Sequence, residues 1–132
     1  MKISTFVANL ITDDMAATVA FYTEQLDFKL TMSVPEQAPF NWVLLKHDTV
    51  ELMFQTRGDF SDDLKINLEE ATGGTLLFHA HVVNIAGWFE RLQSTVKLAF
   101  PIRHTFYGMD EFGFYDPSGY LIVLAEAKGE TV

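Results

Sequence analysis

The chain of 132 residues contains no cysteine. Disulfides, thiolate nucleophiles, iron–sulfur clusters and zinc sites built from cysteine are therefore excluded. Positive charge is scarce as well, because 9 lysines and arginines stand against 18 aspartates and glutamates, which gives a formal net charge of −9. A field of that sign repels phosphate backbones and anionic lipid, so we expect neither nucleic acid nor a membrane as a partner.

Long hydrophobic runs and phosphate-binding loops are also lacking. No apolar stretch approaches the ~18 residues of a membrane span, and residues 1–5 lead directly into a predicted strand, so we expect a cytoplasmic protein. No Gly-x-Gly-x-x-Gly, phosphate loop or Gly-x-Ser-x-Gly elbow is present. What is there is an ordinary globular composition, with 48% hydrophobic residues, and the length predicts a single domain over residues 1–132.

The main positive feature is a strand-then-helix unit that occurs twice. Residues 7–12 have the pattern of a strand, Asp13 or Asp14 is a helix cap, and residues 15–26 form an amphipathic helix. The same order returns 70 residues later, with a strand at 77–83, a cap at Asn84 and a helix at 85–92. Duplicated units place equivalent residues around a pseudo-twofold axis, which favours a site between the copies.

Three further strands are predicted after each helix. They cover residues 27–30, 42–46 and 49–55 in the first copy, and 96–100, 111–115 and 120–126 in the second, where Pro101 breaks the first of the three. The fold class is therefore α+β, with two tandem βαβββ modules at residues 1–57 and 75–128. The acidic segment 58–74 is predicted to be a linker with one short helical turn near Leu64.

Several short strings in this order resemble the vicinal-oxygen-chelate superfamily, which includes glyoxalase I, extradiol dioxygenases, fosfomycin-resistance enzymes and bleomycin-resistance proteins. The matching strings are Asp14 followed by Phe21-Tyr22, Leu26-Asp27-Phe28, Val50-Glu51-Leu52, Tyr107-Gly108-Met109 with Phe112, and Asp116-Pro117-Ser118-Gly119-Tyr120. The resemblance implies a curved mixed sheet around a cleft, helices on the outer face, and a homodimer.

The resemblance also implies where a metal ion would bind. Relatives with a divalent ion take one ligand from the first strand and one from the last strand of each module, which correspond here to Val7, Glu51, Leu77 and Val123. Only Glu51 could bind a metal, because the other three side chains are aliphatic and offer no lone pair. The chain therefore resembles the metal-free branch typified by bleomycin-resistance proteins, which implies no cofactor and a small molecule sequestered without chemical change.

Strand alternation predicts which side chains line the cleft. Pairing outward from a turn at His47-Asp48 sets Leu44 opposite Glu51, and pairing outward from Pro117-Ser118 sets Phe112 opposite Val123. The candidate ligand-binding residues are Trp42, Leu44, Glu51, Met53, Gln55, His79, His81, Phe112 and Phe114. This surface is mainly aromatic and apolar, so it suits an aromatic organic molecule, and Glu51 would favour a cationic group.

Two other functions stay open. Glu51 with His79 and His81 could hold zinc, iron, nickel or manganese, which would make the protein a metal-dependent enzyme of the glyoxalase or dioxygenase type. The two histidines could equally be structural, recognise a ligand or sense pH. The third function is a dimeric scaffold or regulator whose cleft is filled by its own side chains. Separately, Trp42, Phe112 and Phe114 could each fill the core or form a dimer contact, and Glu51 could be paired with a neighbouring Lys or His.

Overall fold

The computed structural model describes residues 1–65, 70–74 and 76–128. Its internal contacts divide the chain into two compact units, residues 1–72 and 73–132, and each is described by itself. The division falls inside the segment 58–74 that the sequence predicts as a linker. No helix in the described part of the chain is both long enough and apolar enough to cross a membrane.

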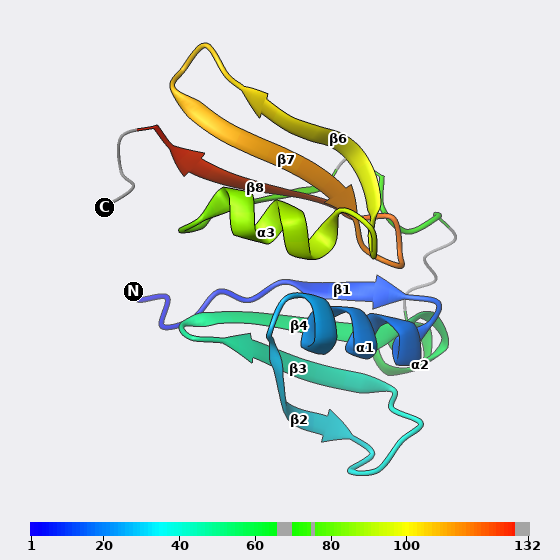
Figure 1. The fold of residues 1–132 in the computed structure, drawn as a ribbon. Helices are drawn as coiled ribbons and strands as arrows, with labels where there is room; N and C mark the ends of the chain where they lie inside the picture. Colours follow the sequence, from blue (N-terminus) through cyan, green and yellow to red (C-terminus); the bar gives the residue numbers. More distant parts are fainter. Residues whose placement is uncertain (66–69, 75, 129–132) are drawn as a thin grey trace. The chain divides into compact units, whose positions relative to one another are not determined.

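The N-terminal unit is a four-stranded sheet with two helices (Figure 1). Its elements are β1 (Asn9–Thr12), α1 (Met15–Gln25), β2 (Lys29–Val34), β3 (Trp42–His47), β4 (Val50–Thr56) and α2 (Arg57–Leu64). The strand order is β1-β4-β3-β2, in which β1 runs parallel to β4 and the other pairs are antiparallel. The sheet therefore has two edges, at β1 and β2.

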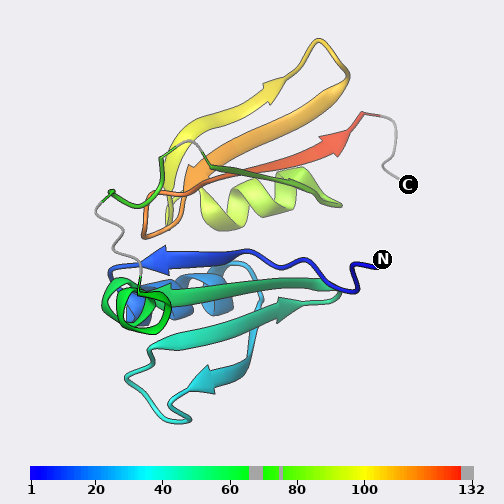
Figure 2. The same ribbon diagram turned by 180° about the vertical axis from the view of Figure 1, so that it is seen from behind.

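Helix α1 covers one face of this sheet, as Figures 1 and 2 show from opposite sides. The helix begins where the carboxylate of Asp14 accepts the amide proton of Ala17 at 3.0 Å, a typical N-cap. Tyr22 is buried and its ring lies 5.0 Å from that of Phe54 on β4. Phe54 pairs with Val43 across the sheet, so the face that carries these residues is the core of the unit.

Helix α2 occupies part of the predicted linker. The sequence predicts one short turn near Leu64, whereas the structure has eight helical residues. The Thr56 hydroxyl accepts the amide proton of Asp59 at 3.4 Å, and Asp59 places negative charge in the first turn, where the helix dipole favours it. The helix ends at Lys65, which is in the left-handed conformation. Residues 66–69 and 75 of the predicted linker and second module lie outside the described residues.

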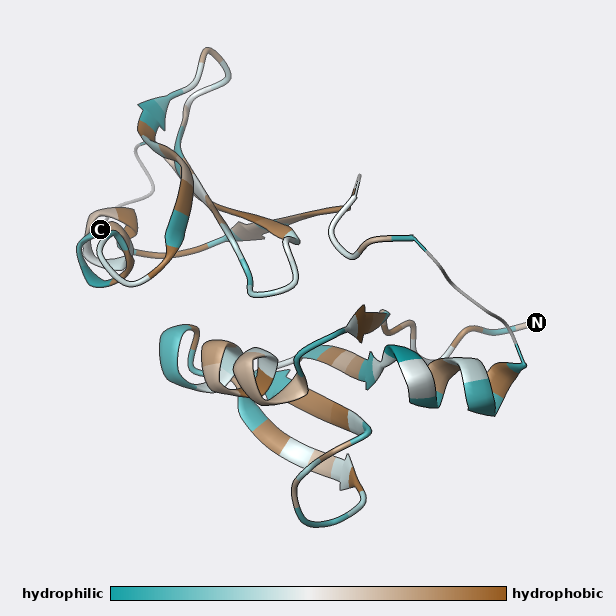
Figure 3. Cartoon of the chain, turned by 90° about the vertical axis from the view of Figure 1, so that its right-hand side faces the viewer, coloured by the Kyte–Doolittle hydropathy of each residue, from teal (hydrophilic) through white to brown (hydrophobic). Residues whose placement is uncertain are grey.

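The C-terminal unit repeats the order of one strand, one helix and three strands, with no counterpart of α2 among the described residues. Its elements are β5 (Leu77–His81), α3 (Ile85–Leu92), β6 (Lys97–His104), β7 (Met109–Tyr115) and β8 (Leu121–Ala127). The strand order β5-β8-β7-β6, with β5 parallel to β8, matches that of the N-terminal unit. Brown and teal bands follow one another along the strands in Figure 3, as expected when one face of a sheet is apolar. The predicted α+β fold of tandem βαβββ modules is confirmed.

Helix α3 packs on β7 and β8. The ring of Phe89 lies 5.1 Å from that of Phe112 on β7, in an edge-to-face arrangement. The first turn of α3 is held by Glu126 of β8, whose carboxylate oxygens accept the amide protons of Asn84 at 2.9 Å and Ile85 at 3.1 Å. The face of the sheet that carries Phe112 and Glu126 is thus the face under the helix.

One predicted boundary in this unit is wrong. The sequence predicts that Pro101 ends a strand at residue 100, but β6 runs through the proline to His104. Strand β6 is at the edge of the sheet, where a residue without an N–H group is tolerated, and the β6–β7 register shifts between Phe100 and Arg103. The irregular edge absorbs the proline without ending the strand.

Candidate functional site

The β3–β4 hairpin places the predicted residues of the N-terminal unit on one face, although its register differs from the prediction. Leu44 pairs with Met53, and Lys46 pairs with Glu51, so the predicted pairing of Leu44 with Glu51 is wrong. The shift changes partners by two residues, and side chains alternate with period two, so each residue keeps its face. The face of this sheet opposite α1 carries Trp42, Leu44, Lys46, Glu51, Met53 and Gln55.

Gln55 is the most enclosed polar group on this face. Its side-chain carbonyl accepts a hydrogen bond from Asn9 at 2.9 Å, and its amide donates to the Asp59 carboxylate at 2.8 Å. Only 5% of Gln55 is exposed, so both hydrogen bonds stabilise the link between β1, β4 and α2. Gln55 therefore has structural partners, while Trp42 and Leu44 are partly exposed.

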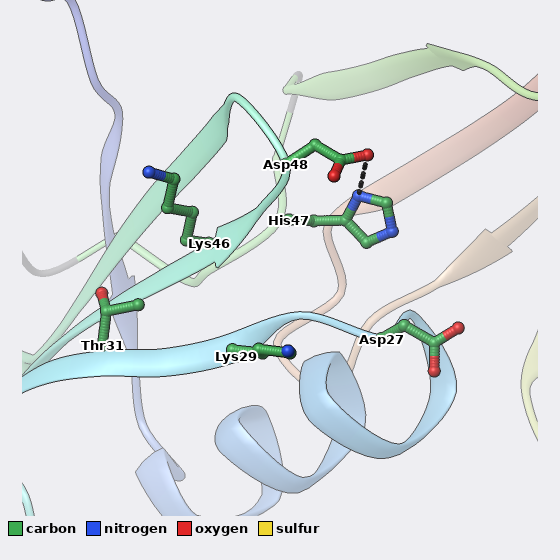
Figure 4. Close-up of a pocket in the computed structure, with 6 residues that line it drawn as sticks. All are labelled: Asp27, Lys29, Thr31, Lys46, His47 and Asp48. Carbon is green, nitrogen blue, oxygen red and sulfur yellow. Dashed lines mark ion pairs between the residues drawn. The ribbon is translucent and has the colours of Figure 1, made fainter.

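A pocket of about 250 Å³ lies at the β2–β3 side of the same unit (Figure 4). It is lined by Asp27, Lys29, Thr31, Lys46, His47 and Asp48. Lys29 and Lys46 are partners across the two strands, and two aspartates at the other end of the pocket offset their charge. No sequence motif predicts this pocket, and Thr31, which lines it, lies at the register shift between Leu30 and Met32.

The histidines of the C-terminal unit lie as predicted. Leu77, His79 and His81 share one face of β5, where His79 is the register partner of Val123 and His81 that of Ala125. The two imidazole rings are 5.5 Å apart. This surface is the C-terminal helix-free face, and its members are Leu77, His79, His81, Glu111, Gly113, Val123 and Ala125.

Phe112 and Phe114 do not lie on that face, and their predicted position is wrong. Phe112 pairs with Leu124 and Phe114 with Ile122, one residue away from the predicted partners, and both rings are fully buried on the side of α3. The connection after Tyr115 has an odd number of loop residues, with Gly119 at φ 88°. A shift of one residue turns every side chain of a strand to the other face.

Glu111 occupies the helix-free face instead. Only 2% of its side chain is exposed. Its Oε1 atom accepts three hydrogen bonds, from Arg103 Nε at 2.9 Å, Arg103 Nη2 at 2.5 Å and the Tyr107 hydroxyl at 3.1 Å. Its Oε2 atom is buried without a hydrogen-bond partner, and Nε2 of His79 lies 3.6 Å from it. One oxygen of this buried carboxylate is thus fully hydrogen-bonded, and the other has no hydrogen-bond partner.

Phe100 and Gly113 support Arg103 in this arrangement. The guanidinium carbon of Arg103 lies 4.7 Å from the centre of the Phe100 ring, within cation–π range. The ring in turn lies against Gly113, where an added Cβ would come within 2.5 Å of it. A larger residue at position 113 would therefore displace the ring that holds Arg103 beside Glu111.

The electrostatics of the cluster favour the ionised carboxylate. Burial raises the pKa of Glu111, but the hydrogen bonds from Arg103 and Tyr107, the charge of Arg103 and the contact with His79 outweigh it, so the pKa lies below its ordinary value. The hydrogen bond to Glu111 raises the pKa of Arg103. The pair therefore remains charged at neutral pH.

The donor groups present do not fit the metal site of the chelating relatives. Leu77 and Val123, which correspond to ligand positions in those relatives, do lie on the C-terminal helix-free face, but neither offers a lone pair. Within either unit, over the described residues, no three His, Asp or Glu side chains gather as a metal site. The alternative set of Glu51, His79 and His81 takes residues from both units and stays a prediction.

Sequence reasoning missed Glu111, Arg103 and Tyr107. Tyr107 belongs to a string that carries the family resemblance, and Glu111 follows it by four residues. Counting alternation from a three-residue loop at Pro117–Gly119 would have placed Glu111 opposite Ala125, on the face of the histidines. The alternation along the strand was therefore visible in the sequence, but the face it assigns to Glu111 depends on the assumed length of the loop.

Solved structures share this fold over nearly the whole chain. A glyoxalase/bleomycin resistance protein/dioxygenase from Nocardioides has a TM-score of 0.78 at 19% identity, covering 99% of this chain and 89% of that one. TioX from Micromonospora sp. ML1 has a TM-score of 0.74 at 17% identity, over 94% and 98% of the two chains. Lactoylglutathione lyase from Agrobacterium tumefaciens has a TM-score of 0.71 at 20% identity, over 96% of each. These identities show a common fold alone.

Sequence comparison supplies the family. No curated protein is significantly similar to the chain. The family model described as Glyoxalase/Bleomycin resistance protein/Dioxygenase superfamily matches residues 3–124, which is most of the sequence. The βαβββ order of both units agrees with that match. The chain therefore belongs to the glyoxalase/bleomycin resistance protein/dioxygenase superfamily.

Proposed function

We propose that this protein binds a small organic molecule without a metal ion, on the C-terminal helix-free face, and sequesters it without making or breaking a bond. The observation that carries the proposal is Glu111, a carboxylate with 2% of its side chain exposed and one oxygen without a hydrogen-bond partner. Burying a charged group is unfavourable unless hydrogen bonds compensate. A half-satisfied carboxylate beside a partly exposed histidine is a feature expected of a binding site.

The surroundings of Glu111 suit an organic ligand. Leu77 is 49% exposed, and His79 and His81 present imidazole rings beside it. Val123 and Ala125 form an apolar floor between the strands, because both are buried on this face. Each buried aromatic ring or aliphatic side chain contributes on the order of 1–3 kcal/mol to ligand binding by area and stacking. Glu111 and its polar neighbours then orient the ligand through hydrogen bonds.

The absence of chelating donors supports a binding protein over a metal enzyme. The lyase and dioxygenase reactions that the resemblance implies use a metal ion as Lewis acid, and three of the four positions that hold it in relatives are the aliphatic residues Val7, Leu77 and Val123 here. The donors that remain on the C-terminal helix-free face are His79, His81 and Glu111, and over the described residues they do not gather as a group that could hold a metal ion. Sequestration requires no such group.

A ligand screen by thermal unfolding tests the proposal. A compound at 100 times its dissociation constant should stabilise the wild-type protein by about 2.7 kcal/mol and should be recovered chemically unchanged. Glu111→Gln should weaken its binding, whereas Glu51→Gln, on the other unit, should not. A compound recovered in altered form, or stoichiometric metal in protein purified without chelator, would refute the proposal.

A further inference from the structure

Glu111 accepts hydrogen bonds from Arg103 and Tyr107, and it also lies beside His79. Its position there determines which nitrogen of the imidazole is available to the ligand. We infer that Glu111 holds His79 in the tautomer with its proton on Nε2, so that Nδ1 accepts a hydrogen bond from a neutral ligand carrying an N–H or O–H group, such as an azole, indole or phenol. This inference rests on the proposed function, since it names the ligand class of the same site.

The tautomer follows from the one open oxygen of Glu111. An ionised carboxylate only accepts hydrogen bonds, and the three donors from Arg103 and Tyr107 all go to Oε1. The Oε2 atom faces Nε2 of His79 at 3.6 Å. A lone pair on Nε2 would be repelled by that oxygen, whereas an N–H there is attracted to it. The proton of a neutral His79 therefore belongs on Nε2.

The other nitrogen of His79 is then an acceptor at the surface. The side chain of His79 is 41% exposed although Nε2 faces a buried carboxylate, so part of the side chain remains accessible to a ligand. Nothing in the described part of the chain forms a hydrogen bond with Nδ1. Here one nitrogen is assigned by Glu111 and the other is left for a donor on the ligand.

Charge favours a neutral donor over a cation. The carboxylate of Glu111 and the guanidinium of Arg103 form a close ion pair, so their charges offset each other on this face. The attraction for a cation that the sequence predicted was assigned to Glu51, which belongs to the N-terminal unit. The group that would meet the ligand at His79 is an uncharged lone pair. Recognition therefore depends on donating a hydrogen bond and not on positive charge.

His104 provides an internal control for the rule. Its Nδ1 atom, not Nε2, contacts the carboxylate of Asp110. The same argument therefore assigns its proton to Nδ1, the opposite tautomer to that of His79. Both histidines belong to the C-terminal unit, so one sample tests both assignments under identical conditions.

Long-range proton–nitrogen NMR correlation of the full chain, labelled at histidine, measures both tautomers in mildly alkaline buffer. We expect His79 to carry its proton on Nε2 alone and His104 on Nδ1. In Glu111→Gln the amide can donate to Nε2, so the Nδ1-protonated form of His79 should appear. A proton on Nδ1 of wild-type His79 refutes the inference, as does an unchanged His79 pattern in a folded Glu111→Gln variant. Should that variant not fold, the wild-type spectrum still decides.

A pair of probes tests the ligand class. Indole and N-methylindole differ in one N–H group, and losing that hydrogen bond should weaken binding roughly tenfold, measured by the shift of the His79 resonances. His79→Phe should remove the difference, and His81→Phe should preserve it. Equal affinities, or no binding of either probe, refute the ligand class. If another compound binds in a way that requires Glu111 but not His79, the proposed function stands and the ligand class is wrong. If the screen finds no ligand at all, the proposed function is refuted, while the tautomer measurement remains valid.

Discussion

On the C-terminal helix-free face, Gly113 leaves room for the Phe100 ring, and Glu111 is a buried carboxylate. His79 and His81 were predictable, because alternation along one strand needs no knowledge of its partner. Glu111 and Gly113 were not, because their face depends on how β7 pairs with β8, and the length of one loop decides that pairing. The Phe100 ring above Gly113 is a third such case, since it follows from the shifted β6 register.

Gly113→Ala should destabilise the protein. The new Cβ would meet the Phe100 ring at 2.5 Å, and overpacking of this kind typically lowers the free energy of unfolding by about 1–3 kcal/mol. Urea unfolding measures the loss, and the double variant with Phe100→Leu should recover part of it. The control is Gly58→Ala in α2, where nothing lies within 4 Å, and where alanine should stabilise by up to about 1 kcal/mol. Equal effects at both glycines would contradict the role of Phe100.

Glu111→Gln should lower stability in a pH-dependent way. The pKa of Glu111 lies below its ordinary value of 4.5, so its ionised form stabilises the folded state above that pH. The contribution disappears as the pH falls through the lower pKa of the folded state. Near neutral pH we expect the wild type to exceed the variant by about 1–3 kcal/mol in free energy of unfolding, and the difference to shrink below pH 4.5. Urea titrations over a pH series measure it, and a difference independent of pH would be inconsistent with the ion pair.

The helices illustrate what element-scale prediction can reach. The sequence predicted Asn84 and one of Asp13 and Asp14 as caps, and the side chains of Asp14 and Asn84 each accept an amide proton of the first turn of their helix. Local patterns are sufficient for such caps because donor and acceptor are three residues apart. Glu126 holds the same end of α3 from 42 residues away along the chain, so no local pattern could show it. Helix α2 was underestimated because its acidic sequence has little apolar periodicity.

Glu126→Ala should destabilise α3 selectively. The substitution removes both oxygens that accept the amide protons of Asn84 and Ile85, and caps of this kind contribute about 1–2 kcal/mol. Hydrogen exchange should accelerate for the amides of α3 and remain unchanged in α1. The matched variant Asp14→Ala, which removes one cap of α1, should give the reverse pattern. Similar acceleration in both helices would show that these contacts act only through global stability.

At the scale of the whole molecule, fold and family were within reach of the sequence, while the binding surface was only partly so. The repeat and the ordered strings predicted tandem βαβββ modules, and the family match over residues 3–124 agrees. Hydrophobic periodicity and duplication are global signals that survive small errors in boundaries. Two of the nine candidate ligand residues, Phe112 and Phe114, are in the core. Their predicted face was wrong because it depended on whether the loop between β7 and β8 has an odd or an even number of residues.

The net charge of −9 makes its own prediction for the whole protein. Because phosphate contacts dominate protein–DNA affinity, an acidic protein should show no saturable binding to duplex DNA even at low salt. Fluorescence anisotropy of a labelled duplex measures this directly. A saturating curve that weakens with added salt would reveal a basic surface that the overall charge conceals, and would reopen nucleic acid as a partner.

Pro101 has a consequence for self-association. A strand at the border of a sheet exposes unpaired amide groups that can recruit a strand from another molecule, which is a route to aggregation. On β6 the proline removes one of those amides, and the register shifts beside it make the border uneven. Strand β2, the corresponding border of the N-terminal unit, has no proline between Lys29 and Val34 and exposes Met32 and Val34. Register shifts occur at both borders, since the β2–β3 register also shifts between Leu30 and Met32, so the proline is the protection that one module has and its duplicate lacks.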